Sequence, residues 1–139
     1  MNKYGKGRGF LVTWDELVIG QVYGPHQFHV SEDVLRKYLS AVQDKNIFYY
    51  LENQCCPPTM AALYFGPILS NIPAEGRIHA KQQFCFHMPA KIGDTLHTTM
   101  TVSNKYIKRE KKYVDLSMRT EKSDGELVVS GVSALIWPC

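Results

Sequence analysis

The second half of the chain alternates with a period of two, and this alternation limits the possible folds more than any other feature. From residue 77 onward one face carries Ile78, Ala80, Gln82, Phe84 and Phe86, and the other carries His79, Lys81, Gln83, Cys85 and His87. Similar alternation follows at 96–102 and 114–119, and residues 126–137 (ELVVSGVSALIW) are apolar on both faces. This pattern is typical of half-buried strands followed by a central strand. We therefore expect consecutive long strands that form an antiparallel meander.

A shorter segment before these strands is apolar nearly all round. Residues 59–72 read TMAALYFGPILSNI and follow the break Cys55-Cys56-Pro57-Pro58. Two successive prolines exclude a helix across that point, while Pro58 suits the first position of a new one. A helix that is apolar on every side is expected to be buried, and Gly66-Pro67 predicts a kink or an early end.

The N-terminal third predicts one strand and one amphipathic helix. Residues 17–24 (LVIGQVYG) resemble a short strand that ends in the turn pair Gly24-Pro25. Ser31 offers an N-cap, acidic residues follow it, and apolar residues recur at helical spacing until Asp44. Residues 46–54 permit a short helical turn.

The most economical arrangement of these elements is a curved sheet wrapped around the apolar helix, because the sheet must bury one face and the helix all of itself. We therefore predict an α+β hot-dog fold, with a curved antiparallel sheet around a central apolar helix. The 139 residues are expected to form a single domain, 1–139, with a loose arm at 1–9. Such a sheet leaves a long edge, so pairing with a second copy or a related subunit is expected.

Composition and cysteine spacing exclude several classes of function. A net charge of +3 is too small to indicate a nucleic-acid partner. The cysteines at 55, 56, 85 and 139 match no zinc-binding spacing, so no metal site is expected. We interpret them as thiols in a reducing cytoplasm. No segment has the length of a signal peptide or a membrane span, which favours a cytoplasmic protein.

Three groups of residues resemble a known family: DKN at 44–46, PPT at 57–59 and RIHAKQQFCFHMPAKIGDTL at 77–96. Together they are similar to the MaoC-like (R)-specific enoyl-CoA hydratases and 3-hydroxyacyl dehydratases, especially the branch that resembles the dehydratase domain of type I fatty acid synthase. In that branch an H-x-x-Q-x-F run enters a strand and a Pro-x-x-x-Gly-Asp turn leads to the next, here matched by His79, Gln82, Phe84, Pro89, Gly93 and Asp94. The resemblance implies a hot-dog fold and reversible hydration of an enoyl thioester, or support of a subunit that performs it.

The resemblance also implies candidate catalytic residues. In the family motif G-D-x-N-P-[LI]-H, the aspartate and the histidine hold and activate one water. Asp44 matches the aspartate, Asn46 matches the supporting asparagine, and Tyr49 stands in the place of the histidine, while Gln43 and Ile47 replace the glycine and the proline. A tyrosine, with an ordinary pKa near ~10, donates hydrogen bonds but is a poor base at neutral pH. The expected water-activating pair is therefore incomplete.

Several functions remain open. The chain is either the member of a heterodimer or heterotetramer that lacks the catalytic histidine, or a self-sufficient homodimeric hydratase that uses Asp44 with Tyr49 or His79. A hot-dog acyl-CoA thioesterase is a further alternative, although residues 59–72 contain no acid. A non-catalytic acyl-binding subunit is another. The simplest role of Asp44 itself is to cap the next turn.

Cations are concentrated in one predicted hairpin. The run NKYIKREKK at 104–112 holds Lys105, Lys108, Arg109, Lys111 and Lys112. Most such runs are solvated turns. The alternative is contact with the phosphates of coenzyme A or with an acidic carrier protein. No separate cofactor is expected, since the acyl-CoA or acyl-carrier thioester is itself the substrate.

Overall fold

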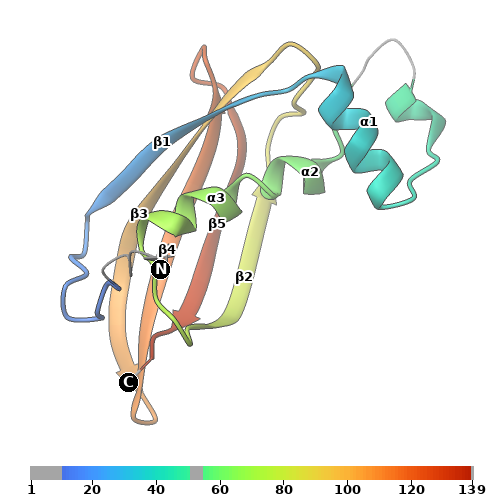
Figure 1. Ribbon diagram of the computed structural model, residues 1–139. Helices are drawn as coiled ribbons and strands as arrows, with labels where there is room; N and C mark the ends of the chain where they lie inside the picture. Colours follow the sequence, from blue (N-terminus) through green and yellow to red (C-terminus); the bar gives the residue numbers. More distant parts are fainter. Residues whose placement is uncertain (1–10, 51–54, 139) are drawn as a thin grey trace, which may run out of the picture.

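The structure is a computed structural model that describes residues 11–50 and 55–138. The expected loose arm at 1–9, Cys139 and the end of the helical turn expected at 46–54 lie outside these residues. One antiparallel sheet has the strand order β1-β3-β4-β5-β2. Its strands are β1 (Val22–His29), β2 (Ile78–Phe86), β3 (Thr95–Lys108), β4 (Lys111–Lys122) and β5 (Leu127–Ile136). Figure 1 shows the sheet curving around the central helical segment, so the predicted hot-dog architecture is confirmed.

The long strands follow the alternation in the sequence. On β3 and β4 the inward side chains are fully buried, among them Leu96, Met100, Val102, Leu116 and Met118. Arg109 and Glu110 join the two strands and both have positive φ (49° and 62°). Two successive left-handed residues form the type of tight turn that matches the twist of an antiparallel hairpin.

The first strand differs from its prediction. A strand over 17–24 was expected to end at Gly24-Pro25, but β1 runs from Val22 to His29 and continues through that pair. The register with β3 shifts between Tyr23 and His26, which accommodates a proline that cannot donate a ladder hydrogen bond. Gly24 has φ +95°, and a Cβ there would lie 2.7 Å from the Thr98 carbonyl oxygen. The Gly-Pro pair therefore marks a bulge on an edge strand and not a turn.

The first helix agrees with its prediction. Helix α1 spans Glu32–Ala41, and Ser31 is its N-cap, with its Oγ accepting the Val34 N–H at 3.2 Å. Leu35 and Leu39 on its inner face are buried. A short 3-10 helix, η1 (Ile47–Tyr50), follows after a loop.

The central helix is broken, and one side of it is exposed, although burial on every side was expected. It consists of α2 (Pro58–Ala62), α3 (Phe65–Ile68) and η2 (Leu69–Asn71). Because Pro67 has no N–H, the carbonyl of Leu63 accepts from the Gly66 N–H at 3.1 Å. The break therefore lies one turn before the predicted kink. It leaves the Leu63 side chain 60% exposed, on the side away from the sheet core.

Candidate active site

Asp44 lies in a well-defined loop directly after α1. The Gln43 N–H donates to the Ser40 carbonyl at 3.2 Å and the Asp44 N–H donates to the Leu39 carbonyl at 3.0 Å. Gln43 has φ +56°, the left-handed conformation that glycine usually supplies in this Schellman arrangement. Gln43 thus adopts the conformation that the motif glycine favours, although it carries a side chain.

The side chains of Asp44 and Asn46 both hold the backbone of the next turn. Asp44 Oδ1 accepts the Asn46 N–H at 2.8 Å, and Asn46 Oδ1 accepts the Phe48 N–H at 3.1 Å. These are successive side-chain caps of the kind that aspartate and asparagine form before short helices. At least one oxygen of Asp44 therefore serves to fix η1.

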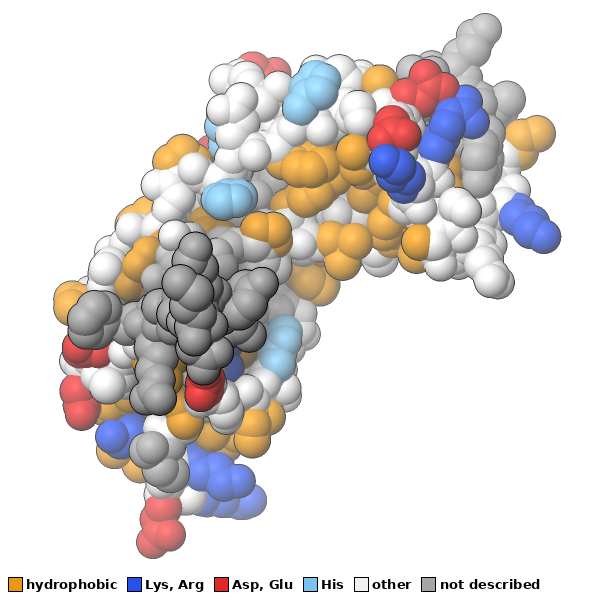
Figure 2. All heavy atoms as spheres, in the orientation of Figure 1, with side chains coloured by type: hydrophobic (Ala, Val, Ile, Leu, Met, Phe, Trp, Pro, Cys, Tyr) orange, Lys and Arg blue, Asp and Glu red, His pale blue; other side chains and the backbone are white. Residues whose placement is uncertain are grey.

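Tyr49 occupies the position of the motif histidine and packs as an aromatic at the edge of the core. Its half-buried ring meets Phe48 edge-to-face with the centroids 5.5 Å apart. The neighbouring side chains Ile47 and Phe48 are 70% and 46% exposed. Hydrophobic side chains also gather over the region of α1 and α2 in Figure 2. The segment around Asp44 thus presents apolar surface to the outside of the single chain.

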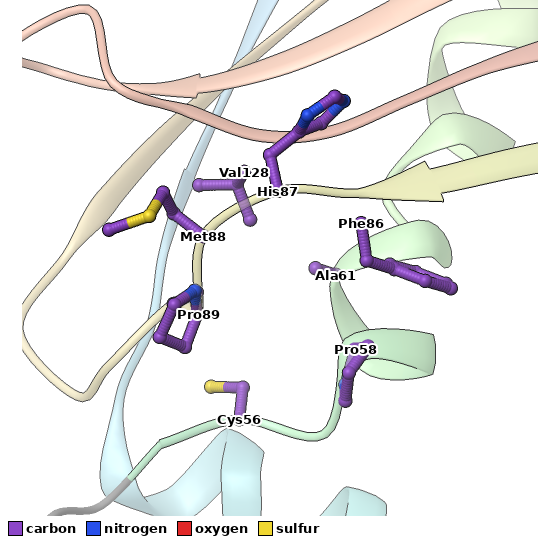
Figure 3. A pocket seen from close by; sticks show the side chains of 9 residues that line it. Cys56, Pro58, Ala61, Phe86, His87, Met88, Pro89 and Val128 are labelled. Atoms are coloured by element: carbon purple, nitrogen blue, oxygen red, sulfur yellow. The ribbon is translucent and has the colours of Figure 1, made fainter.

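A cavity of about 230 Å³ lies between the start of α2 and the end of β2. Figure 3 shows its lining, which includes Cys56, Ala61, Phe86, Met88 and Val128. This lining is largely apolar, as expected of a site that accepts an aliphatic chain. The His87 side chain also belongs to the lining, but its ring points away from the cavity in Figure 3 and its Nε2 lies 2.9 Å from Ser130 Oγ.

Cys56 is not a nucleophile at neutral pH. Burial, with smaller contributions from Cys55 and Asp94, raises the pKa of its thiol to about 12. Nucleophilic cysteines require the opposite, a lowered pKa. Cys56 therefore acts as a small buried side chain in the wall of the cavity.

The Gly93-Asp94 turn has a structural role. Asp94 Oδ2 accepts the Lys91 N–H at 2.8 Å and lies 3.3 Å from Lys122 Nζ. Burial lowers the pKa of Lys122, but its contacts with Asp94 and Glu126 outweigh this and raise the pKa overall. The turn thereby ties the end of β4 to the loop that lines the cavity.

His79 lies on a different face from the one predicted. It pairs with Leu135, while Phe86 farther along β2 pairs with Val129, and both partners are buried in the core. The register shifts immediately after His79, where Ala80 is taken up as a bulge. Opposed residues share a face and a bulge reverses the alternation, so His79 faces the concave side together with Phe86.

The single chain does not bring His79 and Asp44 together. His79 belongs to the start of β2, whereas α1, η1 and the cavity lie near its other end (Figure 1). Within one chain, His79 and Asp44 therefore do not form a common site. Asp44, Asn46 and Tyr49 do share one loop.

The predicted cation cluster is divided. Lys105 Nζ donates to the Leu17 carbonyl at 2.6 Å and lies 4.3 Å from the centroid of the Trp14 ring. Lys112 Nζ also lies 5.4 Å from that ring centroid and 4.0 Å from Asp15 Oδ2. The other three cations are exposed around the β3–β4 turn, at the end of the sheet opposite α1 (Figure 1): Lys108, Arg109 and Lys111. Lys105 is thus part of the packing, and contact of the others with coenzyme A stays a prediction.

Sequence reasoning missed Tyr64, at the break between α2 and α3. Its ring stacks on Phe28 with the centroids 3.7 Å apart, and its hydroxyl is buried without a hydrogen-bond partner among the described residues. Burial and, to a lesser degree, Cys56 raise its pKa. No sequence signal separated it from the other aromatics of the apolar segment.

The described residues show neither a metal site nor a helix suited to a membrane. The described residues contain no cluster of histidine, cysteine and acidic side chains that could hold a metal ion. None of the helices in the described ranges is long and apolar enough to span a membrane.

Comparison with known proteins gives a family match and several solved structures with a similar fold. Residues 17–130 match the family described as "FAS1-like, dehydratase domain region". The R-hydratase PhaJ1 from Pseudomonas aeruginosa has a similar structure, with a TM-score of 0.77 and 23% identity over 92% of this chain and 86% of that chain. The search among curated proteins found no match.

Two similar structures from Mycobacterium tuberculosis are complexes. The HadBC (3R-hydroxyacyl-ACP dehydratase) complex gives a TM-score of 0.72 and 20% identity over 85% of this chain and 96% of that chain. The ChsH1-ChsH2 complex gives 0.73 and 9% identity over 87% and 98%. At these identities the likeness shows the fold.

Proposed function

The chain belongs to the FAS1-like dehydratase region family of MaoC-like proteins, and from this premise we propose that it is the supporting subunit of a heteromeric dehydratase. The enzyme interconverts a 3-hydroxyacyl thioester with a trans-2-enoyl thioester and water. The substrate is carried by coenzyme A or by an acyl carrier protein. A sister subunit of the same fold supplies the catalytic histidine, and both work in the cytoplasm.

The observation that carries this proposal is the state of the Asp44 loop. Hydration across a double bond needs a group that removes a proton from water and a group that stabilises the developing negative charge. Here the aspartate loop keeps a defined shape, but Tyr49 stands at the histidine position and one Asp44 oxygen caps Asn46. The loop is thus preserved as a structural element without its usual base.

The two edge strands of the sheet differ, and the difference supports a partner at β2 and not at β1. Edge strand β1 contains Pro25, which lacks an N–H, and its register shifts there, so it is a poor template for another strand. Edge strand β2 has nine residues and no proline. It carries Phe84 and Phe86, which are 39% and 46% exposed. A hot-dog sister subunit that pairs with β2 would cover both aromatics.

Two alternatives have less support. A thioesterase needs a carboxylate or another nucleophile near the central helix, but residues 59–72 contain no acid and the Cys56 thiol stays protonated. A self-sufficient hydratase would use Asp44 with Tyr49 or His79. Tyr49 is a poor base at neutral pH, and His79 lies at the other end of β2, so only a second copy of the chain would bring it near this loop. The apolar cavity beside β2 supports the view that this chain still binds an acyl group. Acyl binding is the role that a subunit without its own base can keep.

Paired substitutions in the assembled complex test this function. The sister subunit is any MaoC-like chain of the same genome that keeps the aspartate and the histidine. We expect the complex that carries Asp44→Asn in this chain to hydrate crotonyl-CoA at a rate within about twofold of the unmodified complex, because no catalytic base is lost. The equivalent aspartate change in the sister should reduce it by roughly 100-fold or more. If Asp44→Asn alone removes the activity, this chain is catalytic and the proposal is wrong.

A further inference from the structure

The proposed function leaves His79 without a role, and His79 lacks the hydroxyl contacts that three other histidines make. His29, His87 and His97 each lie within 3.4 Å of a threonine or serine hydroxyl. His79 is exposed, and like His26 it makes no side-chain hydrogen bond among the residues that the structure describes. Its imidazole is therefore available to a group from outside the chain.

The bulge at Ala80 determines where this imidazole points. Without it, strict alternation would place His79 on the convex face, away from the central helix. With it, His79 pairs with buried Leu135 and shares the concave face with Phe84 and Phe86. The concave face holds the cavity, but at the far end of the same strand.

Pairing across β2 removes this separation. When two equivalent edge strands pair antiparallel, the start of one lies against the end of the other. Opposed residues share a face, so in a pairing that aligns the two strands end to end, His79 of this chain would lie against the concave residues at the end of the partner strand. In this chain those residues are Phe84 and Phe86, and Phe86 lines the cavity. The same fold puts the sister's cavity at the corresponding place.

We propose that His79 reaches across the β2 interface and donates a hydrogen bond to the acyl thioester bound in the sister subunit's cavity. The proposal rests on the proposed function, because it requires a sister subunit at β2. The cavity wall is largely apolar, so an imidazole at its rim supplies a polar group that can orient the thioester. This chain then completes a site whose base belongs to its partner.

The first test is a binding experiment that needs no turnover. This chain is labelled with isotopes in its histidines, combined with the unlabelled sister subunit, and titrated with S-hexyl-coenzyme A, a thioether that cannot be hydrated. The His79 resonance is identified by its loss in His79→Gln. We expect it to shift on titration in the complex and to stay unchanged in the chain alone. An equal shift in the chain alone, or no shift in the complex, overturns the proposal.

The second test is kinetic. In the complex, His79→Ala should lower kcat/KM for crotonyl-CoA about tenfold, as expected for one lost hydrogen bond, and His79→Asn should restore part of it. His97→Ala is the matched control, since His97 is held by Ser123 at 3.2 Å and should have no effect. An active complex that is insensitive to His79→Ala contradicts this inference and leaves the proposed function standing. Absence of a complex, seen in the measured mass, contradicts both.

Discussion

The two ends of the sheet are built differently. We call the region of residues 11–20, the β3–β4 hairpin and Trp137 the hairpin end. There, side chains form hydrogen bonds between segments that are far apart in the sequence. The indole N–H of Trp14 donates to the Tyr113 carbonyl, and that of Trp137 donates to the Val12 carbonyl, both at 3.0 Å. At the α1 end, which comprises α1, η1 and residues 87–94, exposed apolar residues border a cavity of about 230 Å³. We infer that the hairpin end stabilises the fold and that the α1 end together with β2 meets the partner and the substrate.

The largest expected effect is on binding of the sister subunit, and it should distinguish the β2 interface from the hairpin end. Phe86→Asp puts a charge into the proposed β2 interface and should weaken binding of the sister subunit by roughly 100-fold, the size expected for an interface hot spot. Ile107→Asp is the matched control, because Ile107 is also exposed on a strand but lies at the hairpin end. Sedimentation of the mixed subunits measures both. Equal weakening by the two variants would contradict the division between the ends.

The second effect concerns stability and belongs to the hairpin end. Trp14→Ala removes the hydrogen bond to Tyr113 and the ring beneath Lys105, so it should lower the free energy of unfolding by about 2–3 kcal/mol. Trp14→Phe keeps a ring and should cost only about 1 kcal/mol. Urea unfolding measures both changes. Sister binding by the folded variants should be unchanged, and its loss would show that the hairpin end takes part in assembly.

The third effect is a pH dependence at the α1 end. The pKa of Cys56 rises from 9.0 to about 12 on folding, so above pH 9 the unfolded state loses its proton first. The stability that the buried, protonated Cys56 thiol contributes is fully present below pH 9 and is lost as the pH rises toward 12. The slope approaches about 1.4 kcal/mol per pH unit. Urea unfolding should show a loss of stability that begins near pH 9 and steepens toward this slope above about pH 10 in the native chain, and a weaker loss in Cys56→Ala. Identical slopes would mean that the thiol is not buried as described.

The smallest effect concerns the loop that holds Asp44. Gln43 has φ +56°, which disfavours any residue with a Cβ. Gln43→Gly should therefore raise the free energy of unfolding by about 0.5–1 kcal/mol, while the activity of the complex stays the same. Ser40→Gly, inside α1, is the control and should lower stability by a similar amount. A destabilising Gln43→Gly would show that the left-handed loop is not adopted.

Much of the fold was predictable because local patterns and packing agree. The alternation at 96–102 and 114–119 predicted the inner faces of β3 and β4, and Ser31 marked the start of α1. The failures lie where a single residue changes the register. Pro25 converts a predicted turn into a bulge, and the missing N–H of Pro67 breaks the helix before the expected kink. Such shifts depend on the neighbouring strand or turn, which the alternation of one segment cannot show.

The candidate site was less predictable for the same reason. The motif match placed Asp44, Asn46 and Tyr49 in one loop, but the capping hydrogen bonds of the first two appear only in the structure. The face of His79 depends on the bulge at Ala80, and the packing of Lys105 depends on Trp14, a residue far away in the sequence. Residue type alone contained none of this information.

The central claim is that this chain lacks the base for hydration and supports a sister that has it. The most direct test follows the absorbance of the conjugated bond of crotonyl-CoA with this chain alone, the sister alone and the two mixed in equal amounts. We predict no turnover by this chain alone and a clear gain in the mixture over the sister alone. Turnover by this chain alone that Tyr49→Phe abolishes would contradict the claim, because Tyr49 would then replace the histidine.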